Sequence, residues 1–280
     1  MKSFMSFFTA MLSTRHIPSL LIFGMNFCIL VIIVHLCMPE HHPLIIFFVS
    51  AALTLTALAV VVSPVGDWWV LKTLDTKMYK AENTNVADRV LPLFESVKRE
   101  ARRQDPEISE HVKLYISAEE DINAYAIGRR IVCLTYGAVQ ACDDDVLKAL
   151  LGHEFGHLSQ RDSEASMMIY VGMMPLGTIE TVTRFFTFIL VVQFFYYLFL
   201  FPFCWVLKHL VRLLRSIGSK AAENGADAFS VRLGHGYALR YFMQAISYSE
   251  GKRSLLDSIF ASHPASADRL EHIDHLLGLR

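Results

Sequence analysis

Two long runs without a formal charge lie near the start of the chain, and they constrain its fold more than any other feature. Residues 17–38 and residues 44–62 contain no Asp, Glu, Lys or Arg, and only five residues separate them. A helix needs about 20 consecutive apolar residues to cross the hydrocarbon core of a bilayer. We therefore expect two membrane-spanning helices that form a hairpin.

A second pair of apolar runs follows later in the chain. Residues 167–183 contain Glu180 as their one formal charge, and residues 185–207 contain none. Arg184 lies between them, which predicts a very short turn around this residue. Two crossings return the chain to the side from which it entered, so polar segments on either side of the pair can share one site. The chain is predicted to be a mainly α-helical polytopic membrane protein with four transmembrane helices.

These spans divide the chain into four parts. We expect an N-terminal segment and first hairpin at 1–66, the first polar part at 67–165, the second hairpin at 166–210 and the second polar part at 211–280. Basic residues next to membrane spans favour the cytoplasmic side, so both termini and both polar parts are predicted to be cytoplasmic. The residues that set this orientation are Lys2, Arg15, Lys72, Lys77, Lys80, Lys208 and Arg212.

The composition agrees with a membrane protein and excludes some other classes. Hydrophobic residues make up 53% of the chain and charged residues 19%, against about 45–50% and about 25% in soluble proteins. The formal net charge of −1 gives no reason to expect a nucleic-acid partner. The five cysteines are odd in number and contain no Cys-x-x-Cys, which argues against both a disulfide framework and a cysteine zinc site.

The first polar part contains the sequence His153-Glu154-Phe155-Gly156-His157. Two histidines four residues apart lie on one face of a helix and can reach the same metal ion. The glutamate between them lies close enough to a metal-bound water to take its proton. Such a short pattern also occurs in ordinary amphipathic helices. We nevertheless interpret it as a site for one Zn²⁺ per chain.

A catalytic zinc ion takes three protein ligands and one water, so the two histidines need a partner. The extended metzincin pattern would require a third histidine at position 163, which is Ser163. The remaining option is a glutamate on a later helix, and Glu223 is a candidate. Asp227 lies one turn further on the same face, where an aspartate can hold the far nitrogen of a zinc-bound histidine. Taken alone, two acids at this spacing are usually surface charges.

Two segments resemble strands, Val112 to Ser117 and Arg130 to Tyr136, since both are rich in β-branched and aromatic residues. Residues 119–128 are expected to connect them. We predict a small sheet that packs against the helix of the histidine motif. An exposed edge of this sheet could hold a substrate by main-chain pairing, or the sheet could be purely structural.

Four motifs in order resemble the signatures of HtpX-type membrane zinc metalloproteases, which are relatives of the CAAX prenyl endopeptidases. The chain departs from this family at Asn224-Gly225, where an aromatic or bulky residue and a variable one are usual. The motifs are Asn123-Ala124-Tyr125-Ala126, the histidine motif, Glu223-x-x-Ala226-Asp227, and His263-Pro264 with Arg269.

The resemblance implies a zincin-like α+β protease domain and a role for each matching residue. Zinc would be held by His153, His157 and Glu223, with Asp227 orienting a ligand. Glu154 would be the general base and His263 would support the tetrahedral intermediate. Arg269 would brace the site, and Asn123 and Ala124 would lie on the substrate-binding edge.

We therefore expect a zinc-dependent endopeptidase in a bacterial inner membrane. Protein or peptide substrates are expected, in particular misfolded or damaged membrane proteins, which makes quality control the leading hypothesis. One alternative is the site-specific processing of lipidated or short peptides. An alternative of another class is a non-catalytic membrane scaffold that binds zinc.

Overall fold

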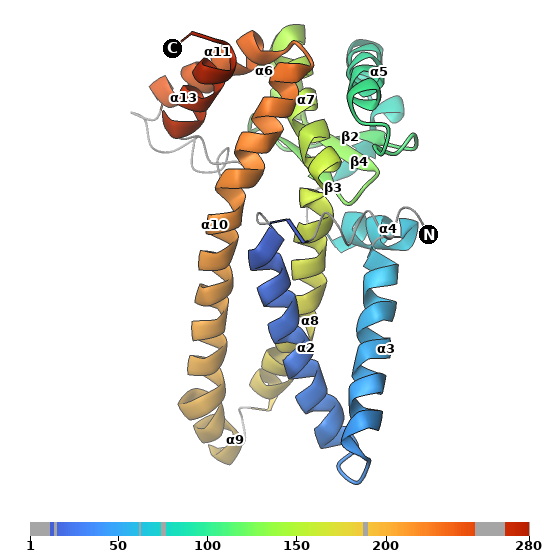
Figure 1. The fold of residues 1–280 in the computed structure, drawn as a ribbon, viewed down its shortest axis with the longest axis vertical. Coiled ribbons are helices and arrows are strands. Elements are labelled where there is room, and N and C mark those ends of the chain that lie inside the picture. The colour runs from blue at the N-terminus through green and yellow to red at the C-terminus, as the bar shows by residue number, and fades with distance from the viewer. Residues whose placement is uncertain are drawn as a thin grey trace. The chain divides into compact units, whose positions relative to one another are not determined.

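The computed structural model describes residues 12–13, 16–61, 63–73, 77–186, 190–249 and 267–279. The chain forms two compact units, each built from two stretches of sequence (Figure 1). The apolar unit contains Met1–Ser63 and Ala165–Lys220, and the mixed unit contains Pro64–Glu164 and Ala221–Arg280. The last change of unit follows Lys220, within α10, whereas the expected boundary follows residue 210.

The apolar unit consists of helices. Among the described residues, two of them are long and apolar enough to cross a membrane, α2 and α3, which agrees with the first predicted hairpin. Phe27 of α2 and Phe47 of α3 contact each other edge to face, with ring centroids 5.7 Å apart. Few residues of either helix are buried in the structure, as expected of helices that face lipid. The helices are α2 (Ile17–Cys37), α3 (Pro43–Val61), α8 (Asp162–Phe185), α9 (Leu190–Phe195), a π-helical turn (Tyr196–Leu200) and α10 (Phe201–Arg232). The first three residues of α8 and the part of α10 after Lys220 belong to the mixed unit.

The second predicted pair of spans corresponds to α8 and to α9 with α10. Arg184 lies in the last turn of α8, and this helix ends one residue later, at Phe185. Glu180 of α8 forms an ion pair with Lys208 of α10, so the one acid in this apolar run is neutralised by a neighbouring helix. That this pair crosses a membrane stays a prediction.

The mixed unit contains a four-stranded sheet in the order β1-β2-β4-β3. Strands β2 and β4 are parallel, and the two outer pairs are antiparallel. The prediction of two strands is correct for β2 and β4 and wrong for residues 119–128, which contain β3. Gly128, with a φ of 56°, lies in the turn that folds β3 back onto β4. The strands are β1 (Met78–Lys80), β2 (Lys113–Ser117), β3 (Ala124–Ile127) and β4 (Ile131–Thr135).

Helix α7 lies at the centre of the mixed unit, and twelve of its residues are buried. Its Phe155 stacks on Phe94 of α5, with centroids 5.7 Å apart, and both belong to the core beneath the sheet. The unit therefore holds the histidine motif inside its core. The helices of this unit are α4 (Pro64–Thr73), the 3-10 turn Ala81–Asn83, α5 (Ala87–Gln104), α6 (Tyr136–Ala141), α7 (Asp144–Gln160), α11 (Gly236–Ser249) and α13 (Ala267–Leu276).

The start of α7 is fixed by a side-chain cap. A carboxylate oxygen of Asp143 accepts a hydrogen bond from the backbone N–H of Val146 at 2.8 Å. This contact satisfies one of the N–H groups that have no partner within the helix. Asp144 and Asp145 occupy the first turn, where negative charge is favoured by the helix dipole.

We expect Asp143→Ala to destabilise the mixed unit by about 1 kcal/mol, because the capping hydrogen bond is lost. The midpoint of thermal unfolding, followed by circular dichroism in detergent, would fall accordingly. Asp145→Ala removes a charge from the same turn without removing the cap and serves as the control. Equal midpoints for the two variants would contradict this role of Asp143.

Candidate metal centre

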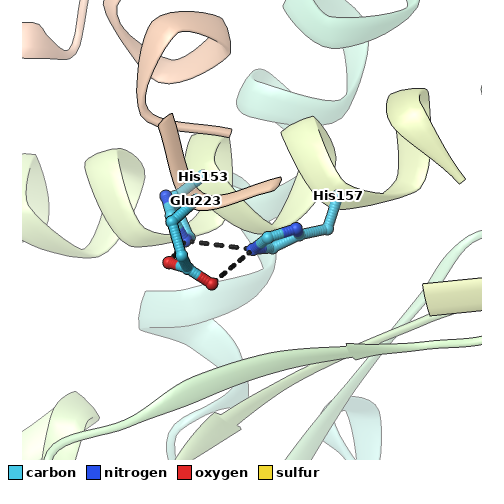
Figure 2. Close-up of side chains that lie close together, drawn as sticks. All are labelled: His153, His157 and Glu223. Atoms are coloured by element: carbon cyan, nitrogen blue, oxygen red, sulfur yellow. Dashed lines mark hydrogen bonds and ion pairs between the residues drawn. The ribbon is translucent and has the colours of Figure 1, made fainter. Parts of the chain in front are cut away.

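Three side chains from two helices converge in the mixed unit (Figure 2). His153 and His157 project from one face of α7, and Glu223 reaches them from α10. The two Nε2 atoms are 3.2 Å apart, and the Glu223 carboxylate lies 3.3 Å from Nε2 of His153 and 3.6 Å from Nε2 of His157. All three residues are buried, and together they could hold a metal ion.

The approach of α10 to α7 depends on small residues at their crossing. A Cβ atom on Gly156 would lie 2.7 Å from the Cα atom of Ala226, which is far inside van der Waals contact. One turn further along α10, the Ser230 hydroxyl donates a hydrogen bond to the carbonyl of Ala149 of α7 at 2.9 Å. Gly156 occupies one of the two free positions of the histidine motif. The crossing therefore requires glycine at position 156. The close approach of the two helices brings Glu223 within reach of the histidines.

The departure from the family at Gly225 also has a packing reason. A Cβ atom here would lie 2.0 Å from Oε1 of Gln160. The Gln160 amide in turn donates a hydrogen bond to the carbonyl of Gly156 at 3.2 Å. A glycine inside a helix costs about 1 kcal/mol relative to alanine. Here the missing side chain leaves room for Gln160 between the two helices.

Asp227 and Arg269 lie where the resemblance implies. The carboxylate of Asp227 is 2.8 Å from Nδ1 of His153, so this nitrogen donates its hydrogen and leaves the Nε2 lone pair for the cluster. Arg269 of α13 donates two hydrogen bonds to Asp227, at 2.8 Å and 2.7 Å. Its third nitrogen lies 2.9 Å from the Glu223 carboxylate. The Arg269 guanidinium thus contacts both Glu223, a candidate ligand, and Asp227, which orients the candidate ligand His153.

The charges of this cluster affect one another strongly. Burial would raise the pKa of Asp227, but the hydrogen bonds and charges of Arg269 and His153 outweigh it and lower the pKa to about 2. Burial would lower the pKa of His153, but Asp227 and Glu223 outweigh burial and raise the pKa, so a cation at Nε2 must displace a proton. Asp227 is therefore ionised throughout the physiological range.

Glu154 is also deeply buried, with 1% of its surface exposed. Its negative charge, after those of Asp227 and Glu223, adds to the increase in the pKa of Arg269, which burial alone would lower. Glu154 therefore belongs to the same electrostatic cluster as the three side chains that converge.

A contact that the sequence did not reveal involves Asp162. Its carboxylate lies 3.1 Å from Nδ1 of His157, and both side chains are largely buried. The sequence of residues 161–164 indicates only the end of the polar part. An aspartate five positions after a histidine gives no signal by itself, because a straight helix would direct the two side chains to different sides.

The remaining predicted site residues lie elsewhere or outside the described part. Ala124 begins β3, an edge strand in the described sheet that packs beside α7. Asn123 precedes it, and its side-chain oxygen accepts a hydrogen bond from the N–H of Ala124 at 2.9 Å. His263 lies outside the described residues, so its position stays a prediction.

We expect Gly156→Ala to lower both metal affinity and stability, because the added methyl group forces α7 and α10 apart. Overpacking of this kind costs about 1–3 kcal/mol. The same change at Gly24 is the control, since a Cβ atom there would meet nothing within 4 Å. Zinc titration and thermal unfolding of both variants would check this, and unchanged values for Gly156→Ala would contradict the requirement for glycine.

Comparisons with known proteins agree with this geometry. The family model of Peptidase family M48 matches residues 81–277. Three relatives bear the name Protease HtpX homolog. The one from Salinibacter ruber is 25% identical over 237 residues, which cover 76% of this chain and 83% of the relative. Those from Thermoplasma acidophilum and Sulfolobus acidocaldarius are 36% and 30% identical, over 67 and 111 residues.

The last two matches cover 22% and 38% of this chain, and 20% and 34% of the relatives' own lengths. The family match, by contrast, extends over more than half of the chain and includes both histidines and Glu223. The chain therefore belongs to peptidase family M48, and it is a metalloendopeptidase of the HtpX type.

Proposed function

We propose that this protein is a membrane-embedded endopeptidase that uses one Zn²⁺ per chain, held by His153, His157 and Glu223. The observation that carries the proposal is the convergence of these three buried side chains. Two imidazole nitrogens and one carboxylate oxygen form a donor set of catalytic zinc sites, which leave a fourth position for water.

The charge of the surrounding residues also fits a divalent cation. Arg269 faces three acidic groups, Asp227, Glu223 and Glu154, so the buried cluster contains more negative than positive charge. Both histidines have a carboxylate at Nδ1, which leaves each Nε2 available as a ligand. When bound, zinc lowers the pKa of its water and polarises the carbonyl of the substrate.

The protein's own residues supply the remaining chemistry. Glu154 takes the proton of the attacking water and then gives it to the departing amine. His263 donates to the oxygen of the reacting carbonyl, and Arg269 keeps Glu223 and Asp227 in place. Asn123 and Ala124 lie at the start of edge strand β3, which binds the substrate in an extended conformation.

This manner of binding supports a broad substrate range. Pairing with an edge strand uses the main chain of the substrate, which is the same for every sequence. An enzyme of this kind, attached to a bilayer by α2 and α3, suits misfolded or damaged membrane proteins better than one fixed sequence. We place both termini and the active site on the cytoplasmic side of a bacterial inner membrane, because Lys72, Lys77 and Lys80 follow the second apolar run.

We expect Glu154→Gln to keep zinc but to lose cleavage by a factor of about 10² to 10⁴, since it removes only the proton acceptor. Zinc content and casein cleavage of the purified variant would measure this. Glu95→Gln, an exposed acid on α5, should behave like the wild type. Wild-type cleavage by the Glu154 variant would refute its role as the base.

The biological role is tested by the fragments that the enzyme produces. We expect membrane-protein fragments with many scattered cut sites in cells that carry the wild type, and their loss with Glu154→Gln. Quantitative proteomics of the membrane fraction would detect them. A single fixed cut in one lipidated or short peptide would instead indicate a processing protease.

A further inference from the structure

The joint between α7 and α8 has an unusual backbone conformation. Arg161 has a φ of 61° and a ψ of 22°, and it is the one non-glycine residue with positive φ in the described part of the chain. Glycine is the usual residue at such a helix end, because a side chain makes this conformation unfavourable. A residue stays in such a conformation only where the surrounding structure holds it there. The direction in which α8 leaves α7 is therefore fixed at Arg161.

Ion pairs to two neighbouring elements hold the joint. The Arg161 guanidinium lies 3.2 Å from the Glu164 carboxylate in the first turn of α8, and 3.3 Å from that of Glu107 after α5. Glu164 also lies 3.4 Å from Arg129 in the turn between β3 and β4. These contacts connect the end of α7 with the segment after α5 and, through Glu164, with the turn between β3 and β4.

The turn determines where the next side chain points. On an uninterrupted helix, Asp162 would be rotated by about 140° from His157, since each residue adds about 100°. With Arg161 in the left-handed conformation, the carboxylate of Asp162 instead lies 3.1 Å from Nδ1 of His157. A carboxylate at this nitrogen fixes the tautomer and the ring orientation of a metal-bound histidine and makes it a stronger ligand.

We propose that Asp162 is a positioning residue for His157, and that the left-handed turn at Arg161 directs it there. The inference rests on the proposed zinc site. Each of the two histidines then has its own carboxylate, and the two carboxylates come from different helices. Asp227 on α10 holds His153, and Asp162 at the start of α8 holds His157.

The first test compares zinc binding by Asp162→Ala, Asp162→Asn and the wild type. The full chain in detergent would be titrated with zinc against a chelator at constant pH, and its Co²⁺ form examined by visible spectroscopy. We expect zinc affinity about 10–100-fold lower for Asp162→Ala, the usual effect of removing such a partner, and an altered cobalt spectrum. Asp162→Asn should lose less, because its amide oxygen can still accept the hydrogen of Nδ1.

Asp145→Asn is the matched control. It changes the charge of an exposed acid on the same helix, and its affinity and spectrum should equal those of the wild type. Wild-type affinity and an unchanged cobalt spectrum for Asp162→Ala would overturn the inference. Failure of the wild type itself to bind zinc would instead overturn the proposed function, so the two outcomes can be told apart.

The second test concerns the turn. Arg161→Gly keeps the left-handed conformation and loses the ion pairs, whereas the β-branched side chain of Arg161→Val disfavours that conformation. If the backbone directs Asp162, Arg161→Val should lower zinc affinity as much as Asp162→Ala does, and Arg161→Gly should lower it less. The reverse order would overturn the role of the turn. The result for Asp162 stands independently if Arg161→Val does not fold.

Discussion

The close crossing of α7 and α10 is the contact on which the metal centre depends. Each helix supplies only part of the candidate ligand set, and neither part could hold zinc in a three-ligand site alone. Gly156 and Ala226 let the two backbones approach until Glu223 lies beside both histidines. Gly225 extends the same contact by accommodating Gln160. The histidine motif therefore serves helix packing through Gly156 as well as chemistry through its histidines and Glu154.

Burial of so many charges requires that they compensate one another. Arg269 forms hydrogen bonds or ion pairs with Asp227 and Glu223, and an isolated charge at this depth would be very unfavourable. A planar guanidinium group can serve two carboxylates at once, which the single nitrogen of a lysine does less well. The cluster thus combines a fixed geometry with an excess of negative charge that suits a cation.

The parts of this fold that have a local sequence pattern could be predicted from sequence. The apolar hairpin is identified by the length of its uncharged runs, the helix α7 by its two histidines four residues apart, and strands β2 and β4 by their β-branched and aromatic residues. Strand β3 could not be recognised, because its Ala-Tyr-Ala-Ile sequence is a weak strand former and depends on pairing with β4. Asp162 was missed because its position depends on one backbone conformation at Arg161. Glu223 and Asp227 became candidates because two histidines need a third ligand, and the order of the family's motifs supported them. Arg269 was identified from that resemblance alone.

The division of the mixed unit into two stretches of sequence affects how the enzyme is made. The ribosome completes both histidines and Glu154 before the second apolar stretch, whereas Glu223 and Arg269 follow it. A nascent chain therefore lacks Glu223, the third candidate ligand, until α8, α9 and most of α10 have been synthesised. The proposed zinc site therefore cannot act before this point in translation.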